Sequence, residues 1–248
     1  MEVLSVKETF DILDEKVKTE KQLAYLRFGD GRILMIDKKR GWKGDKGDHL
    51  YHPKLQEELI KSFCLKDENY LVSVGCGYKE EKGMRPGTFG KFKNDEELQE
   101  IVQRISNRKR YYNFIALHYL VLFSPLRVIN FIKGFRGRRI LLVGGGHLRE
   151  AACYLKSDFV ETPSVNAYLE FERIYNEIIE KGPEIVILGA GMCSAVLQRQ
   201  LFLTGYEMIT LDFGSLLDAM LEIKSRQWIR DNSDKIKRFR QLCDSQLL

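Results

Sequence analysis

The chain has 248 residues, of which 44% are hydrophobic and 30% are charged, and its net charge is +5. This composition is typical of a soluble globular protein that can bury a substantial core. The small positive charge suits an anionic ligand or an acidic membrane surface, and nucleic acid is not an expected partner. The five cysteines form no C-x-x-C pair and residues 1–21 are too charged for a signal peptide, which excludes a disulfide framework and predicts a cytoplasmic protein.

In chain order, the first part of the sequence predicts alternating helices and strands. Apolar periodicity and runs of strand-forming residues predict a helix over Val6–Thr19, a strand over Leu23–Phe28, a helix over 54–63 and a strand over Tyr70–Val74. Polar, glycine-containing stretches predict loops over 37–48 and 79–93.

The first predicted strand ends in a distinctive tripeptide, in which Asp30 stands between Gly29 and Gly31. Glycine reaches backbone angles that other residues avoid, so the tripeptide predicts a sharp turn. Open α/β sheets bind their ligands at the carboxyl ends of strands. Since Arg27 lies just before the turn, we expect a cation and a carboxylate to face one cleft there; an ordinary surface turn is the alternative.

The middle of the chain, residues 94–135, predicts a helical insertion. Within it, residues 111–126 contain no Asp, Glu, Lys or Arg, and basic clusters flank them. This run is shorter than the ~20 residues that span a bilayer, and Pro125 interrupts it. We therefore expect two core helices separated at Pro125. The alternative is a peripheral membrane contact, with aromatic side chains at the interface and basic side chains on the lipid head groups.

The second half predicts four strands, over 139–143, 158–161, 184–188 and 208–211, which alternate with helices. Strands that alternate with helices through short glycine-rich turns form a mostly parallel sheet with helices on both faces. The sequence therefore predicts one Rossmann-like α/β domain over residues 1–248.

Two glycine-rich turns follow strands of this half, at 144–146 and at Gly189-Ala190-Gly191. Such turns let backbone N–H groups approach a phosphate at a helix N-terminus. The second turn, with Asp212 about 20 residues later, partly matches a dinucleotide fingerprint. An enzyme that uses NAD(P) or S-adenosylmethionine is therefore one alternative. His147, just after the triple glycine, would lie near any bound phosphate.

In this order, the motifs resemble those of the GT-D-fold glycosyltransferases, bacterial enzymes that transfer a sugar from a nucleotide sugar. Residues 27–31, Arg-Phe-Gly-Asp-Gly, resemble the family's R-F-G-D-G-E signature. Pro163 and Asn166 resemble its P-x-x-N-A-aromatic segment, and the Gly191 turn with Asp212-Phe213-Gly214 resembles its last βαβ unit. The resemblance implies transfer to a glycan, a glycoprotein or a lipid-linked acceptor.

The resemblance also implies roles for individual residues. Asp30 and Asp218 would be catalytic, and Asp30 would bind the metal Mn²⁺ or Mg²⁺ that holds the diphosphate. The residues expected to bind the nucleotide-sugar donor are Arg27, Gly29, Gly31, Arg32, Pro163, Asn166, Gly189, Gly191, Asp212 and Gly214.

The sequence departs from the family pattern in its acidic residues. The family has an acidic metal ligand after Gly-Asp-Gly, and here that position is Arg32. The closing segment also lacks the family's His and retains Asp218 among its acids. Because a leaving diphosphate can be stabilised by Arg and Lys as well as by a metal, we hypothesise that Arg32 and Arg27 replace the metal. A scaffold that binds a nucleotide sugar without catalysis is the other alternative.

Overall fold

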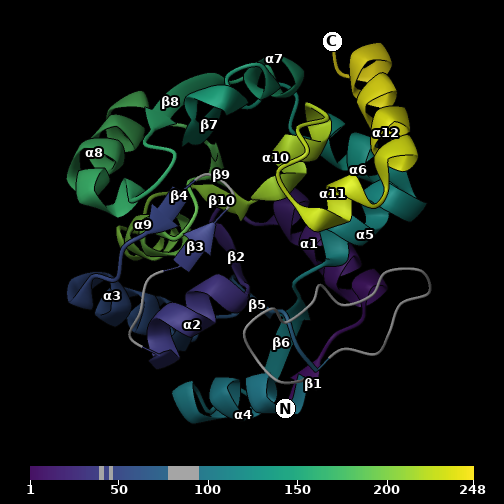
Figure 1. The fold of residues 1–248 in the computed structure, drawn as a ribbon. Helices are drawn as coiled ribbons and strands as arrows, with labels where there is room; N and C mark the ends of the chain where they lie inside the picture. Colours follow the sequence, from purple (N-terminus) through teal and green to yellow (C-terminus); the bar gives the residue numbers. More distant parts are fainter. Residues whose placement is uncertain (39–41, 45–46, 78–94) are drawn as a thin grey trace.

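The computed structural model describes residues 1–38, 42–44, 47–77 and 95–248. Among these residues, eight parallel strands form one sheet in the order β1-β6-β5-β2-β10-β9-β7-β8 (Figure 1). The strands are β1 (Glu2–Val3), β2 (Leu23–Phe28), β5 (Tyr70–Val74), β6 (Arg110–Asn113), β7 (Ile140–Gly145), β8 (Asp158–Thr162), β9 (Ile185–Gly189) and β10 (Ile209–Asp212). The predicted α/β class and the parallel sheet are confirmed.

The sheet has two halves, and each half is built from one half of the chain. Strands β1, β2, β5 and β6 come from residues 2–113, and β7 to β10 come from residues 140–212. The halves join where β2 pairs with β10, with Leu23 opposite Ile209 and Tyr25 opposite Leu211. We call this pairing the central seam. Because all the strands are parallel, their carboxyl ends lie along one edge, and the seam is in the middle of that edge.

Helices cover both faces of the sheet. One face packs against α1 (Val6–Thr19), α5 (Ala116–Phe123), α6 (Pro125–Lys133), α7 (Ala151–Leu155), α10 (Ser215–Met220), α11 (Gln227–Arg230) and α12 (Ser233–Gln246). The other face packs against α2 (Asp30–Lys38), α3 (Pro53–Cys64), α4 (Asp95–Ile105), α8 (Phe171–Lys181) and α9 (Cys193–Leu203). On β2, Leu23 and Tyr25 join the first core, and Leu26 and Phe28 join the second. Since side chains alternate along a strand, Arg27 faces the first layer of helices.

The tripeptide after β2 is a strand-to-helix junction, and the predicted turn is corrected here. Helix α2 begins at Asp30, and the N–H of Ile33 donates to the carbonyl of Gly29 at 3.1 Å. Residues 33–36 are buried in the second core. A glycine in the first turn disfavours a helix by about 1 kcal/mol, and the burial of four large apolar side chains, each worth about 1.5–3 kcal/mol, outweighs it.

Residues 95–135 differ in one respect from the predicted helical insertion. They contain α4, α5 and α6, but also β6, which pairs with β5 in the main sheet. The segment is therefore part of the sheet and is not inserted beside it. Strand β6 was not predicted, because it has only four residues and lies next to a basic cluster. Helices α5 and α6 meet at Ser124, as predicted, since Pro125 lacks the N–H that a continuing helix needs.

Other parts of the chain show smaller differences from the expected elements. A short antiparallel pair, β3 (Trp42–Gly44) and β4 (Gly47–His49), lies in the segment predicted to be a loop. The loop predicted over 79–93 lies outside the described residues. Nowhere in the described ranges is a helix both long and apolar enough to cross a membrane.

Candidate functional site

The central seam brings the residues that follow β2 and β10 to the same part of the sheet edge. Gly29 and Asp30 follow β2, and Phe213 and Gly214 follow β10. The N–H groups of Phe213 and Gly214 both donate to the carbonyl of Leu188, at 3.1 Å each, which folds the chain after β10 over the end of β9. The structure therefore assembles residues from both halves of the chain where α/β sheets bind ligands.

Arg27 is buried at this point, and protein atoms bind every nitrogen of its guanidinium group. Nε donates to the carbonyl of Phe114 at 3.2 Å, and Nη1 donates to the carbonyl of Phe213 at 3.1 Å. Nη2 lies 3.0 Å from Nδ1 of His118, and the guanidinium carbon is 4.2 Å from the centre of the Phe114 ring. Arg27 thus ties the end of β2 to the end of β10 and to the start of α5.

Two glycines make room for this arrangement. A Cβ on Gly214, whose φ is +49°, would lie 2.7 Å from Nη1 of Arg27. A Cβ on Gly29 would lie 2.9 Å from Cζ of Phe114. Both positions therefore exclude a side chain. The sequence suggested glycine at position 29 for its backbone freedom, whereas in the structure a side chain there would collide with Phe114.

Arg32 forms a buried ion pair with Asp212 across the seam. Nη1 of Arg32 lies 2.8 Å from Oδ2 of Asp212, and the two side chains are 8% and 5% exposed. The same guanidinium group donates to the carbonyls of Arg27 and Gly191. Arg32, which we expected to face a diphosphate, is therefore fixed inside the protein and holds the turn after β9 against the start of α2.

The residues around Arg32 do not fit a divalent metal ion. Mn²⁺ and Mg²⁺ prefer carboxylates and other oxygen ligands, and here a guanidinium group lies against the carboxylate of Asp212. In the part of the chain that the structure describes, no three His, Cys, Asp or Glu side chains are grouped so as to hold a metal. Asp30 lies at the first position of α2, where its Oδ1 accepts the N–H of Gly31 at 2.8 Å.

The buried cluster of Arg27, Arg32 and Asp212 carries more positive than negative charge. Within the described residues, Asp212 is the single carboxylate that forms an ion pair in it. Burial lowers the pKa of Arg27, and Asp212 opposes this shift. Burial and the charge of Arg27 lower the pKa of His118 well below its usual value, so its imidazole is neutral. An uncompensated buried charge is unfavourable, and a bound anion would compensate it.

The shifted pKa of His118 predicts a pH-dependent stability. In the unfolded chain His118 binds a proton near its ordinary pKa of 6.5, whereas the folded protein holds it neutral to a much lower pH. The contribution of neutral His118 to the free energy of unfolding is therefore fully present above pH 6.5 and is lost as the pH falls. We expect the free energy of unfolding to drop by about 1.4 kcal/mol per pH unit more in the native protein than in His118→Gln. Urea unfolding of both proteins, from neutral pH downward, measures this; parallel profiles would contradict it.

Ser215, the first residue of α10, is a functional candidate that the sequence analysis missed. Its Oγ accepts from Nε1 of Trp228 at 3.0 Å and lies 3.1 Å from Nε2 of His118. Nη2 of Arg27 lies 3.0 Å from Nδ1 and 3.2 Å from Nε2 of the same imidazole. Ser215 is only half-buried, and the bond from Trp228 leaves its O–H able to donate to another group. No local motif marks this serine.

Asp218, one turn later on α10, pairs with His147, which follows β7. Its Oδ2 accepts from Oγ of Ser225 at 2.6 Å, and its Oδ1 lies 3.4 Å from Nε2 of His147. The imidazole lies over Gly145, where a Cβ would be 2.9 Å from Nδ1 of His147. The Asp218 side chain is 10% exposed and that of His147 is 30% exposed. A buried carboxylate that orients a solvent-accessible imidazole is the arrangement of a general base.

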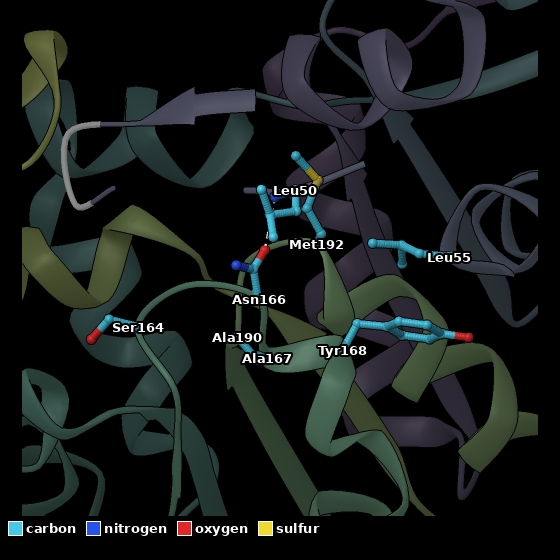
Figure 2. A pocket seen from close by; sticks show the side chains of 8 residues that line it. All are labelled: Leu50, Leu55, Ser164, Asn166, Ala167, Tyr168, Ala190 and Met192. Atoms are coloured by element: carbon cyan, nitrogen blue, oxygen red, sulfur yellow. Dashed lines mark hydrogen bonds between the residues drawn. The ribbon is translucent and has the colours of Figure 1, made fainter. Parts of the chain in front are cut away.

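Pro163 and Asn166 lie on the connection between β8 and α8, and Asn166 lines a small pocket (Figure 2). Asn166 has a φ of +54°, and its Oδ1 accepts the N–H of Leu50 at 2.9 Å. The pocket is lined by Leu50, Leu55, Ser164, Asn166, Ala167, Tyr168, Ala190 and Met192. Ala190 and Met192 flank Gly191, whose carbonyl binds Arg32. The pocket and the ion pair therefore share one turn.

The turn after β9 differs from the phosphate-binding turn predicted there. A Cβ on Gly189 would lie 2.7 Å from Cδ1 of Leu148 and 2.9 Å from Cδ1 of Leu217, so apolar side chains cover this glycine. The N–H of Ala190 donates to Oγ of Ser194 at 3.2 Å. Gly189 therefore packs against apolar side chains, and the N–H of Ala190, which a dinucleotide fingerprint would aim at a phosphate, is bound to Ser194.

The packing at Gly189 can be measured directly. Gly189→Ala forces a methyl group against two leucine side chains, and overpacking of this kind lowers the free energy of unfolding by about 1–3 kcal/mol. Gly75→Ala is the matched control, because a Cβ there would meet Phe114 at an ordinary 3.9 Å. Urea unfolding should show a clear loss for Gly189→Ala alone; equal stabilities would argue against the covered turn.

The fold and the site define a doubly wound α/β protein with its ligand site at the middle of the sheet edge. The sequence model of the glycosyltransferase GT-D fold family matches residues 25–219, and the chain belongs to this family. It is therefore an enzyme of the class that transfers sugars. No curated protein sequence matches the chain.

Solved structures share the fold at low sequence identity. A glycosyltransferase from Streptococcus sanguinis with domain of unknown function 1792 is 20% identical, with a TM-score of 0.70 over 87% of this chain and 82% of that one. A selenomethionine-substituted structure of the same kind of domain is 17% identical, with a TM-score of 0.63 over 87% and 79%. A third structure, described as a distinct glycosyltransferase fold, is 16% identical, with a TM-score of 0.58 over 86% and 78%.

Proposed function

We propose that the chain transfers a sugar from a nucleoside diphosphate sugar to a glycan, glycoprotein or lipid-linked acceptor, and that it needs no divalent metal. The buried excess of positive charge in Arg27, Arg32 and Asp212 is the observation that carries this proposal. As the donor is cleaved, negative charge develops on the leaving diphosphate and must be stabilised. A cation fixed in the protein before the reaction supplies that stabilisation without reorganisation.

The half-buried groups around the cluster would contact the donor. The hydroxyl of Ser215, whose oxygen accepts from Nε1 of Trp228, donates to a phosphate oxygen. Asp30 contacts the donor sugar from the start of α2, next to the backbone of Gly29 and Gly31. The nucleoside lies against Asn166, Pro163 and Gly191 at the rim of the small pocket, while Gly214 lets the backbone approach Arg27.

The acceptor hydroxyl has to lose its proton during transfer. His147, oriented by Asp218, takes this proton; Asp30 is the alternative base. In the same step the acceptor oxygen forms a bond to the anomeric carbon, and the bond from that carbon to the diphosphate breaks. The nucleoside diphosphate leaves with the bonding electron pair.

Thermal unfolding with nucleotides tests the binding part of this proposal. UDP, GDP, dTDP, CMP, NADH and S-adenosylmethionine are each added with EDTA and with Mn²⁺. A ligand that binds only the native state raises its stability by mass action, by about 2.7 kcal/mol at a hundredfold excess over Kd. We expect one nucleoside diphosphate to raise the Tm equally in both conditions. A response that requires Mn²⁺ would refute metal independence, and a response to NADH or S-adenosylmethionine alone would refute the donor class.

The general base is tested by variants that leave the nucleotide in place. Asp218→Asn and His147→Gln should each lower the rate of sugar transfer by about 10²–10⁴-fold, the range of general base catalysis. The shift in Tm caused by the nucleotide should stay unchanged. If Asp30→Asn abolishes transfer and the two variants do not, Asp30 is the base. Nucleotide binding without any transfer would favour the non-catalytic scaffold.

A further inference from the structure

The corner between α5 and α6 exposes apolar side chains. Phe123, the last residue of α5, is 37% exposed, and Leu126, in the first turn of α6, is 52% exposed. Pro125 forces the turn that brings them together. Their side chains border a groove between this corner and α12, which lies beside α5 and α6 in Figure 1.

The other wall of this groove is basic. The charged residues that line it are Arg127, Lys235 and Arg238, and in the part of the chain described by the structure its lining includes no Asp or Glu. Lys235 places its Nζ 3.9 Å from the centre of the Phe123 ring. Arg127 is paired with Asp11 at 2.6 Å, so the unbalanced charge of the groove comes from α12. Exposed Lys237 on the same helix adds to this charge, and exposed Asp234 offsets one unit of it.

Another exposed apolar corner shows that this combination is specific. Leu203, at the end of α9, is 52% exposed and Tyr206 is 53% exposed. Beside them, however, Lys21 pairs with Glu207 at 3.0 Å, so the charge there is balanced. Of these two corners, the one between α5 and α6 combines exposed apolar tips with an unbalanced basic wall.

We infer that the groove between the α5–α6 corner and α12 docks the protein on an anionic lipid surface. Apolar side chains of an interfacial segment enter the boundary between head groups and acyl chains, while lysine and arginine bind the anionic head groups. Phe123 and Leu126 supply the first contact, and Lys235 and Arg238 supply the second. The contact is peripheral, because the helices that form it are 8, 9 and 14 residues long.

The position of α5 connects this surface to the enzyme site. His118, near the start of α5, contacts Arg27, and Phe123 is the last residue of the same helix. Five residues of α-helix span roughly 7.5 Å along the axis. If the proposed transferase function is correct, the docked protein would hold its site close to the head groups, which favours a lipid-linked acceptor. The docking itself does not depend on that function.

Sedimentation with lipid vesicles tests the docking. The full chain is mixed with phosphatidylcholine vesicles, with or without phosphatidylglycerol. We expect binding to the anionic vesicles, weakened by salt, and little binding to the neutral ones. The double variant Lys235→Glu/Arg238→Glu should bind about tenfold more weakly or worse. Phe123→Ser/Leu126→Ser should lose a comparable part of the binding.

Matched controls separate the groove from general effects of charge and apolar area. Lys66→Glu/Lys181→Glu changes the net charge by the same amount at two exposed positions away from the groove, and Leu203→Ser removes a leucine that is as exposed as Leu126. Both should bind like the native protein. The inference would be overturned if the groove variants bound vesicles as well as the native protein does. It would also be overturned if the native protein did not bind anionic vesicles, which is the result expected of a groove for an acidic protein partner. The nucleotide-induced shift in Tm, measured on the same variants, reports separately on the proposed function.

Discussion

Asp212→Asn is expected to lower the free energy of unfolding by about 3–5 kcal/mol, the cost of leaving one member of a buried ion pair without its partner. The variant keeps the size of the side chain and removes its charge, so the guanidinium of Arg32 stays buried beside Arg27 with no carboxylate opposite it. Urea unfolding at neutral pH measures the loss. A bound nucleoside diphosphate should reduce the loss, because its phosphates bring negative charge back to the cluster.

An exposed ion pair provides the control for this result. Lys21 and Glu207 are 75% and 68% exposed, and Glu207→Gln should change the stability by less than about 1 kcal/mol, as for surface pairs in general. The double variant Arg32→Met/Asp212→Leu should recover part of the loss, because replacing both members with apolar residues removes the unpaired guanidinium of Arg32 and leaves the charge of Arg27 alone. A loss below about 1 kcal/mol for Asp212→Asn would show that Arg32 is not confined as described.

Arg32→Glu is expected to create a metal dependence that, as we propose, the native protein lacks. The change puts a second carboxylate against Asp212, and two buried carboxylates in contact disfavour each other's ionisation. The variant should therefore unfold at a lower temperature in EDTA. Mn²⁺ bound between the carboxylates should raise the Tm again. At a hundredfold excess over Kd it adds about 2.7 kcal/mol to the free energy of unfolding.

Two comparisons make this experiment decisive. Arg32→Gln removes the positive charge without adding a carboxylate, so its Tm should fall but should not respond to Mn²⁺. The native protein should not respond either. If the native protein and Arg32→Glu show the same rise in Tm with Mn²⁺, the metal binds elsewhere and the guanidinium of Arg32 does not replace it.

The sequence predicted those elements whose burial shows in a local pattern. The bounds of α1, β2 and β5 agree with the prediction, because long apolar runs and helical periodicity mark them. Helix α2 was missed, since glycine at its start resembles a turn and its stability comes from packing in the second core. Strand β6 was missed because four residues are too few to show alternation, and its partner β5 is distant in the sequence.

The candidate site was predicted as a set of residues but not as a set of contacts. The motifs indicated Arg27, Arg32 and Asp212, yet the pairing of Arg32 with Asp212 joins opposite halves of the chain, and no spacing reveals it. The contacts of buried His118 with Arg27 and Ser215 likewise depend on how α5 meets α10. For Gly189 the motif suggested a ligand contact, because this glycine follows a strand. In the structure a leucine covers it, and the sequence pattern is the same in both cases.

The central seam has a consequence for how the protein folds. Each four-stranded half comes from a continuous stretch of chain, whereas β2 meets β10 only after the two ends of the sequence come together. Contacts between distant parts of a chain are slow to form, because closing long loops costs entropy. The pairing of β2 with β10, and with it the charged cluster, is therefore expected to form late. A chain divided between α6 and β7 should yield two fragments that bind each other, because one hydrophobic core joins helices of both halves, and the proposed nucleotide binding should require both fragments.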